Sequence, residues 1–327
     1  MIIPNVDRYR VWDPLFEGLR VILSHHGEPY SPAHVQGLSG AAFRIGGICP
    51  CAPTCTSAME PQQLAALLGY DAEWVPFEGQ TVEERQAVLA ATMPRLDDEL
   101  AAGRPFLLWH AFTMLEWDVV AGHEGSRFLG RGSYLGLDGY ADADDRRAAG
   151  PDAEPSLGAM LIHKRAGPAP GALRQAEVDS LREAVRHAHD TESLDNVCSG
   201  PWVFLQGLAA YDRWVSAFGL RAASHVPPLQ GDMYCANVYA STHRAAVAYL
   251  QELAPRHGGS GPRLLAAADR FAAEADALDA ARDRINSAYQ AREASPGERE
   301  LIVAALHSAR DAYAAAIDEL QAALPDL

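Results

Sequence analysis

Three of the chain's five cysteines lie within seven positions, in the stretch GGICPCAPTC at residues 46–55. Thiolates this close together can ligate a soft cation such as Zn(II) or Cu(I). They can also form a reactive thiol with a resolving partner, or bury as small apolar side chains. The spacing of Cys49, Cys51 and Cys55 differs from the paired C-x-x-C sets of structural zinc sites, and it lacks an obvious fourth ligand nearby. The sequence therefore leaves three alternatives: a metal site, a redox or nucleophilic site at Cys49 or Cys51, and a structural loop.

The two remaining cysteines lie in the second half of the chain. Cys198, in DNVCSGPW, comes just before a helix that we expect to begin near Pro201. A thiol at a helix N-terminus ionises more easily, so Cys198 is a candidate for a relocated nucleophile, with a structural role as the alternative. Cys235 lies on an apolar helical stretch and is predicted to belong to the core.

A second candidate site combines carboxylates and imidazoles on two expected strands, 104–112 and 116–124. His110 lies on the first strand, and Glu116, Asp118 and His123 lie on the second. Side chains alternate along a strand, so Glu116 and Asp118 are expected on the same face. Two carboxylates beside a histidine can bind a cation or move a proton, and a solvated face of the sheet is the alternative.

Caps and periodicity indicate the elements that must position these residues. In the first half, helices are expected at 13–27, 31–40, 59–68 and 82–102, and strands at 41–48, 72–77, 104–112, 116–124, 125–134 and 159–165. After GPAPG the chain reads as almost wholly helical, at 172–190, 201–218, 232–254, 262–292 and 296–323. We therefore predict an α+β fold, with an N-terminal lobe of residues 1–165 and a helical domain of residues 166–327.

Composition limits the partners and the location. The 327 residues include 43 Asp and Glu against 27 Lys and Arg, which gives a formal net charge of −16. Such a charge repels a phosphate backbone, so nucleic acid is not expected, whereas an amine or a metal cation is compatible. The odd number of cysteines argues against a disulfide framework, and no apolar run approaches the ~20 residues of a membrane span. We expect a cytoplasmic protein without a membrane partner.

Four sequence patterns follow one another in a specific order. They are a capped helix ending in Gly, the motif S-x-x-x-x-x-G-L-x-G-x-x-F, a helix followed by G-x-P, and a strand ending in Gly. They occupy Leu19–Gly27, Ser31–Phe43, Leu100–Pro105 and Trp117–Gly122. Over residues 10–165 this order resembles the butirosin biosynthesis protein H family. The resemblance implies a papain-like N-terminal lobe of the bacteriocin-processing cysteine peptidase kind, followed by a helical part. It also implies acyl transfer or peptide cleavage by a cysteine at the start of the first helix and a histidine leading a strand.

The chain departs from the family at both catalytic positions. The first helix begins with Pro14 and Leu15 where the cysteine should stand, and Glu116 replaces the histidine. Neither Pro nor Leu can attack a carbonyl, and Glu is a poor base near neutral pH. The favoured hypothesis is a diverged acyltransferase-like or peptidase-like protein that binds a small molecule or an acyl carrier protein in the old cleft. The alternatives are a soft-metal or redox protein using the cysteine stretch, and a thiol enzyme whose nucleophile has moved to Cys49, Cys51 or Cys198.

Overall fold

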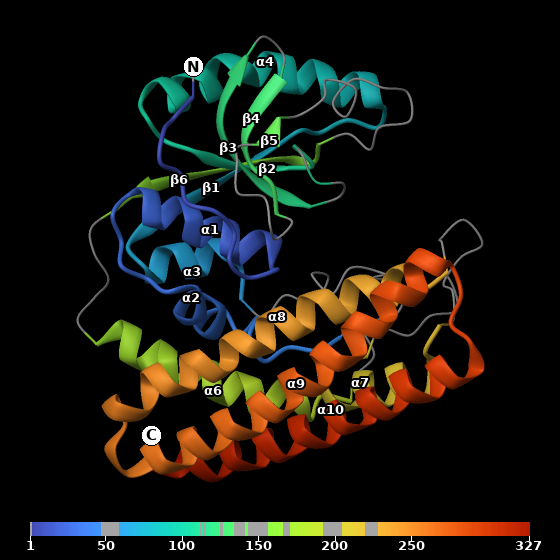
Figure 1. The fold of residues 1–327 in the computed structure, drawn as a ribbon. Coiled ribbons are helices and arrows are strands. Elements are labelled where there is room, and N and C mark those ends of the chain that lie inside the picture. Colours follow the sequence, from blue (N-terminus) through green and yellow to red (C-terminus); the bar gives the residue numbers. More distant parts are fainter. Residues whose placement is uncertain are drawn as a thin grey trace. The chain divides into compact units, whose positions relative to one another are not determined.

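A computed structural model describes residues 2–46, 59–111, 113, 116–124, 127–133, 141–142, 156–165, 171–191, 205–219 and 228–327. Helices and an antiparallel sheet are both present, so the α+β class is confirmed. The chain divides into two compact units (Figure 1). Unit 1 comprises Met1–Val35 and Glu60–Leu173, and unit 2 comprises Gln36–Met59 and Arg174–Leu327. This division differs from the continuous boundary expected near residue 165, because an early segment groups with the later helices.

The sheet of unit 1 has six strands in the order β1-β6-β2-β3-β4-β5, and all its pairs are antiparallel. The strands are β1 (Tyr70–Pro76), β2 (Phe106–Trp109), β3 (Trp117–Glu124), β4 (Arg127–Arg131), β5 (Ala141–Asp142) and β6 (Gly158–Lys164). Five of them match strands expected from the sequence. β5 falls in an acidic, glycine-rich stretch that showed no strand pattern.

Helix α1 (Pro14–His25) forms where the sequence predicted it, because its ends are specified locally. The Asp13 carboxylate accepts a hydrogen bond from the backbone N–H of Phe16 at 3.2 Å. The chain leaves the helix through Gly27 at φ +84°, a conformation that favours glycine. Leu19 and Leu23 are fully buried, as predicted, and the helix packs against β2 and β3.

Helices lie on both faces of the sheet (Figure 1). α1 approaches the face that carries Leu107, and α3 (Pro61–Leu67) packs on α1 and β1. α4 (Val82–Ala101) contacts the opposite face, where Glu99 lies 3.0 Å from His163 of β6. His163 points away from the Leu107 side, because Met160 is in register with Leu107 and side chains alternate along β6.

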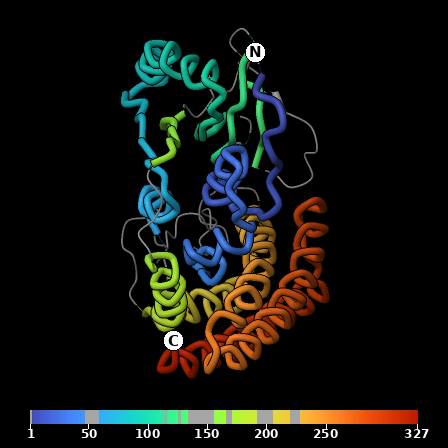
Figure 2. The backbone as a smooth tube through the Cα atoms, turned by 90° about the vertical axis from the view of Figure 1, so that its left-hand side faces the viewer, coloured from blue at the N-terminus to red at the C-terminus, as the bar shows by residue number. Residues whose placement is uncertain are grey.

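The described residues of unit 2 are mostly helical. They include α6 (Ala172–Ala188), α7 (Gly207–Ala217), α8 (Gln230–Leu253), α9 (Gly261–Ala291) and α10 (Pro296–Ala323). α9 packs against both α8 and α10, and the three run side by side (Figure 2). Alanines alternate with Leu264, Phe271, Leu278 and Ile285 along the buried stripe of α9, which lets the neighbouring helices approach closely.

The strand expected at 41–48 does not form over residues 41–46, and residues 47 and 48 lie outside the described residues. α2 (Pro32–Leu38) is followed by turns, and Gly46 makes only an isolated bridge with Gln206. Residues 41–46 are buried like a core strand, which explains the apolar pattern that suggested one. Their backbone groups bond to side chains of the helices instead of to a neighbouring strand.

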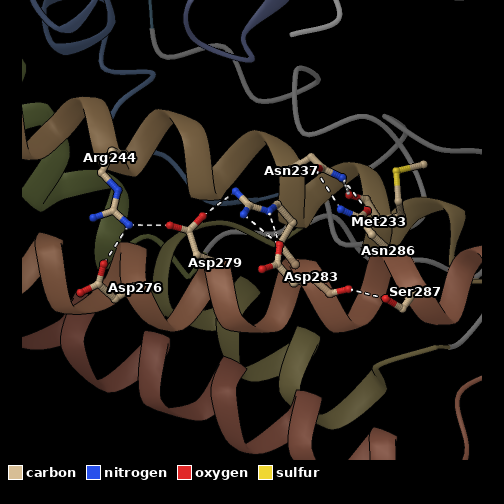
Figure 3. A network of polar contacts seen from close by, with 9 residues as sticks. Met233, Asn237, Arg244, Asp276, Asp279, Asp283, Asn286 and Ser287 are labelled. Atoms are coloured by element: carbon tan, nitrogen blue, oxygen red, sulfur yellow. Dashed lines mark hydrogen bonds and ion pairs between the residues drawn. The ribbon is translucent and has the colours of Figure 1, made fainter. Parts of the chain in front are cut away.

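The outer edge of the α8–α9 contact carries a chain of polar contacts (Figure 3). Arg244 bonds to Asp276 and Asp279, and Asn237 bonds to Asn286. Arg244 and Asp276 are 45% and 73% exposed, so each pair is weakened by solvent and contributes little. None of the described helices is both long and apolar enough to span a bilayer.

Candidate functional site

The cysteines predicted to be metal ligands or nucleophiles cannot be placed in the fold. Cys49, Cys51, Cys55 and Cys198 all lie outside the described residues. Cys235 is a free thiol, fully buried on α8, which confirms its assignment to the core. Within the described ranges, no group of three or more His, Cys, Asp or Glu residues could hold a metal ion.

Asp118 is fully buried, so the expectation of a solvated sheet face is wrong. Its two carboxylate oxygens accept backbone N–H bonds from Thr113 at 2.7 Å and Ser133 at 2.9 Å. These residues follow β2 and β4, and Asp118 thus joins the ends of three adjacent strands. Both oxygens thus act as hydrogen-bond acceptors that hold the strand ends together.

Glu116 and His110 meet at the same end of the sheet. Both are buried, and the backbone N–H of His110 donates to the carbonyl oxygen of Glu116 at 2.6 Å. His110 adopts φ +63°, which is uncommon for a non-glycine residue and turns the chain between β2 and β3. The structure thus brings His110, Glu116 and Asp118 to one turn.

His123 does not belong to this group. Its Nε2 lies 2.8 Å from a carboxylate oxygen of Asp97 on α4. A bulge between Val120 and Gly122 shifts the register of β3, so the strict alternation assumed from the sequence does not reach His123. Of the four residues expected to act together, three are neighbours and one is separate.

Tyr9, which drew no attention in the sequence, lies at the centre of the arrangement. Its hydroxyl oxygen is 3.0 Å from the carbonyl oxygen of Trp117 and 3.3 Å from that of Pro14. It therefore joins the start of β3 to the start of α1. A Cβ on Gly18 would come within 2.6 Å of the Tyr9 hydroxyl and of Leu107, so this close approach requires glycine.

Four carboxylates surround Tyr9. Burial raises its pKa well above the usual value, and the charges of Asp118, Glu17, Asp13 and Glu116 raise it further. The phenol is therefore neutral and serves as a hydrogen-bond donor. Only its position in the folded unit gives it this role, because Trp117 is 108 positions away in the chain.

Glu17 is a fully buried member of these acids. One carboxylate oxygen accepts from the backbone N–H of Arg10 at 2.8 Å and from Nε of Arg20 at 3.0 Å, while the other is buried without a hydrogen-bond partner among the described residues. Burial raises the pKa of Glu17 to about 7, against the lowering effect of Arg20. Arg20 also pairs with Asp7 at 2.5 Å, which fastens the N-terminal segment to α1.

Aromatic rings border this end of the sheet. Trp117 follows Glu116 directly and is half-buried, and its ring meets that of Trp74 edge to face, with centroids 5.5 Å apart. Trp74 is 36% exposed. Indole rings attract organic cations through cation–π contacts.

Comparison with models of protein families finds no family that fits the chain, and comparison with curated proteins finds no relative.

Proposed function

We propose that unit 1 is a papain-like lobe that has exchanged catalysis for binding at the old catalytic position. One observation carries this proposal: the Tyr9 hydroxyl lies between Pro14 and Trp117, the starts of α1 and β3. In the family that the sequence resembles, a thiol and an imidazole would meet at these two elements. A neutral phenol and two backbone carbonyls meet there in this chain.

The negative charge around Tyr9 also opposes acyl transfer or peptide cleavage by a thiolate. A thiolate nucleophile and the oxyanion of acyl transfer are both negative, and both need positive or hydrogen-bond-donating surroundings. Four carboxylates lie near this position instead, those of Asp13, Glu17, Glu116 and Asp118. They would raise the pKa of any thiol placed there and disfavour an oxyanion.

The same charge favours a small molecule that carries an ammonium group. Glu116 directly precedes the half-exposed Trp117 in the chain, and Trp74 extends the aromatic surface. Cation–π attraction to Trp adds to ion pairing with the carboxylate. The net charge of −16 acts in the same direction, and an acyl carrier protein as the partner stays a prediction.

We expect a polyamine such as spermidine to quench tryptophan fluorescence in a saturable, salt-sensitive way. Glu116→Gln should weaken this binding about tenfold, since a charge-assisted contact contributes about 1.5 kcal/mol. Glu124→Gln, at the exposed far end of β3, is the matched control and should leave binding unchanged. A neutral polyol of similar length should not bind.

Two outcomes would contradict the proposal. One is equal binding of spermidine to the wild-type protein, Glu116→Gln and Glu124→Gln. The other is turnover of an acyl thioester or a double-glycine leader peptide by protein in which all five cysteines are replaced.

The alternatives that use thiols rest on the sequence, and they stay predictions. If Cys49, Cys51 and Cys55 ligate Zn(II) or Cu(I), their thiols must be deprotonated, so binding should release protons and weaken as pH falls. Cys51→Ala should then remove the metal, as measured by elemental analysis of untagged protein prepared under reducing, metal-replete conditions. Full metal content in each of the three single alanine variants, or none in the wild type, would leave the stretch as a structural loop.

A further inference from the structure

Residues 43–46 are bound inside unit 2 by their backbone. All four residues are buried, although this short segment forms no strand. Side chains from three helices bond to its N–H and C=O groups: His187 of α6, Tyr239 and His243 of α8, and Tyr313 of α10. We call these four side chains the clamp.

The two tyrosines of the clamp are simple hydrogen-bond partners. The Tyr313 hydroxyl donates to the carbonyl of Phe43 at 2.9 Å. The Tyr239 hydroxyl accepts from the N–H of Gly46 at 2.8 Å and donates to the Gly46 carbonyl. Neither contact changes with protonation near neutral pH, since both phenols bond as neutral groups.

His243 must carry a charge to make its two contacts. Its Nδ1 lies 2.7 Å from a carboxylate oxygen of Glu274, and its Nε2 lies 2.9 Å from the carbonyl oxygen of Arg44. Both partners are acceptors, so both ring nitrogens must donate, which only the imidazolium can do. Glu274 and His243 are fully buried and form an ion pair.

A neutral ring of His187 satisfies its contact with Ile45 best. Its Nε2 lies 2.9 Å from both the backbone nitrogen and the carbonyl oxygen of Ile45. The Ile45 carbonyl, also nearby, already accepts from Gly207 at 2.8 Å. An unprotonated Nε2 satisfies the Ile45 N–H, whereas a protonated one would leave that buried donor without an acceptor.

We propose that residues 43–46 dock into the helical unit through a clamp of two histidines in opposite protonation states, so that docking weakens both when pH falls and when it rises. The same two side chains thus make unit 2 sensitive to pH on both sides of neutrality. The segment they hold directly precedes the cysteine-rich stretch in the chain.

The groups facing each ring agree with these states. Burial lowers the pKa of His187 to about 4; Arg44 and Arg186 lower it as well, while the Ile45 carbonyl oxygen and Glu183 raise it. Burial also opposes the charge on His243, but Glu274 outweighs it and raises the pKa above its usual value, with Arg44 acting against it. The other polar groups around His243 are the phenols of three tyrosines, Tyr211, Tyr239 and Tyr313.

The contributions of His187 and His243 to stability change in opposite directions with pH. His187 has a folded pKa of about 4 against an ordinary 6.5, so its stabilisation is complete above pH 6.5 and is lost as pH falls toward 4. His243 has a raised folded pKa, so its stabilisation is complete below pH 6.5 and is lost as pH rises through that folded value. Docking is therefore expected to be strongest near pH 6.5.

The test measures unfolding by urea between pH 4 and 9 for the wild type, His187→Gln and His243→Gln. The loss of stability toward acid pH is the acid limb of the resulting profile, and the loss toward alkaline pH is the alkaline limb. Each limb should change the unfolding constant by up to about tenfold per pH unit. In the difference between wild type and variant, His187→Gln should remove the acid limb and His243→Gln the alkaline limb. His189→Gln, just after the end of α6, and His307→Gln on α10, both exposed, are the matched controls and should leave both limbs in place.

A second measurement uses the wild type alone, in case a variant does not fold. Nitrogen chemical shifts should show His243 doubly protonated and His187 singly protonated at pH 6.5. Exchange of the Ile45 and Gly46 amides, corrected for intrinsic rates, should be slowest near that pH. A singly protonated His243 at pH 6.5, or limbs that persist unchanged in the two clamp variants, would overturn the proposal.

Discussion

Replacement of Glu274 by leucine is expected to lower the free energy of unfolding of unit 2 by about 3–5 kcal/mol. Glu274 and His243 are both fully buried, and the Tyr211 hydroxyl donates to the same carboxylate oxygen that bonds to His243. Leucine fills a similar volume but leaves the imidazolium without its counter-charge and the phenol without an acceptor. The measurement is urea unfolding at pH 6.5, followed by circular dichroism.

The chain offers a matched control two positions away, at Asp276. Arg244 and Asp276 pair across the same two helices, but in contact with solvent (Figure 3). Asp276→Ala should therefore change the free energy of unfolding by less than about 1 kcal/mol. The double variant Glu274→Leu with His243→Leu should be more stable than Glu274→Leu alone, because it leaves no buried charge. Equal losses for Glu274→Leu and Asp276→Ala would show that the buried pair is not formed.

Helix ends were predictable because the signals for them are local. Ser295 caps α10 by accepting from the N–H of Glu298, and Pro296 occupies its first position, so the expected span of 296–323 matches the observed one. The Asp13–Pro14 pair fixes the start of α1 in the same way. In both cases the residues that determine the boundary are within four positions of it.

The segment at 41–48 was mispredicted because its partners are distant. An apolar run with a β-branched residue is typical of a buried strand, and burial is indeed what the structure gives residues 41–46. The bonds that replace a ladder come from His187 and Tyr239, 142 and 193 positions further along. No pattern within the segment can indicate such partners.

In the candidate site, too, local features were predictable from the sequence and contacts between distant segments were not. Sequence patterns placed Glu116 and Asp118 at the start of one strand, and they put Pro14 and Glu116 where the family resemblance implies a thiol and an imidazole. They could not show that the Asp118 carboxylate oxygens accept hydrogen bonds from two backbone N–H groups. Nor could they show that the Tyr9 hydroxyl lies within hydrogen-bond distance of the Pro14 and Trp117 carbonyls. Those contacts join three separate segments of unit 1, and only the tertiary fold brings the segments together.

Leu23→Ala is expected to lower the free energy of unfolding of unit 1 by about 2–5 kcal/mol. Leu23 is fully buried on α1, which packs against β2 and β3, so truncation leaves a cavity between the helix and its neighbours. Ser24→Ala, at the next and less buried position of the same helix, is the control and should change stability by less than about 1 kcal/mol.

The measurement must separate the two units. A chain with two compact units can unfold in more than one step, so urea unfolding should be combined with hydrogen exchange of the amides of α1. Leu23→Ala should speed exchange throughout α1 and leave α9 and α10 unchanged. Because α1 also carries Asp13 and Glu17, the same loss should loosen the carboxylates around Tyr9. An unchanged unfolding midpoint would mean that α1 does not pack as the central helix of unit 1, and the proposed correspondence with a papain-like lobe would fall with it.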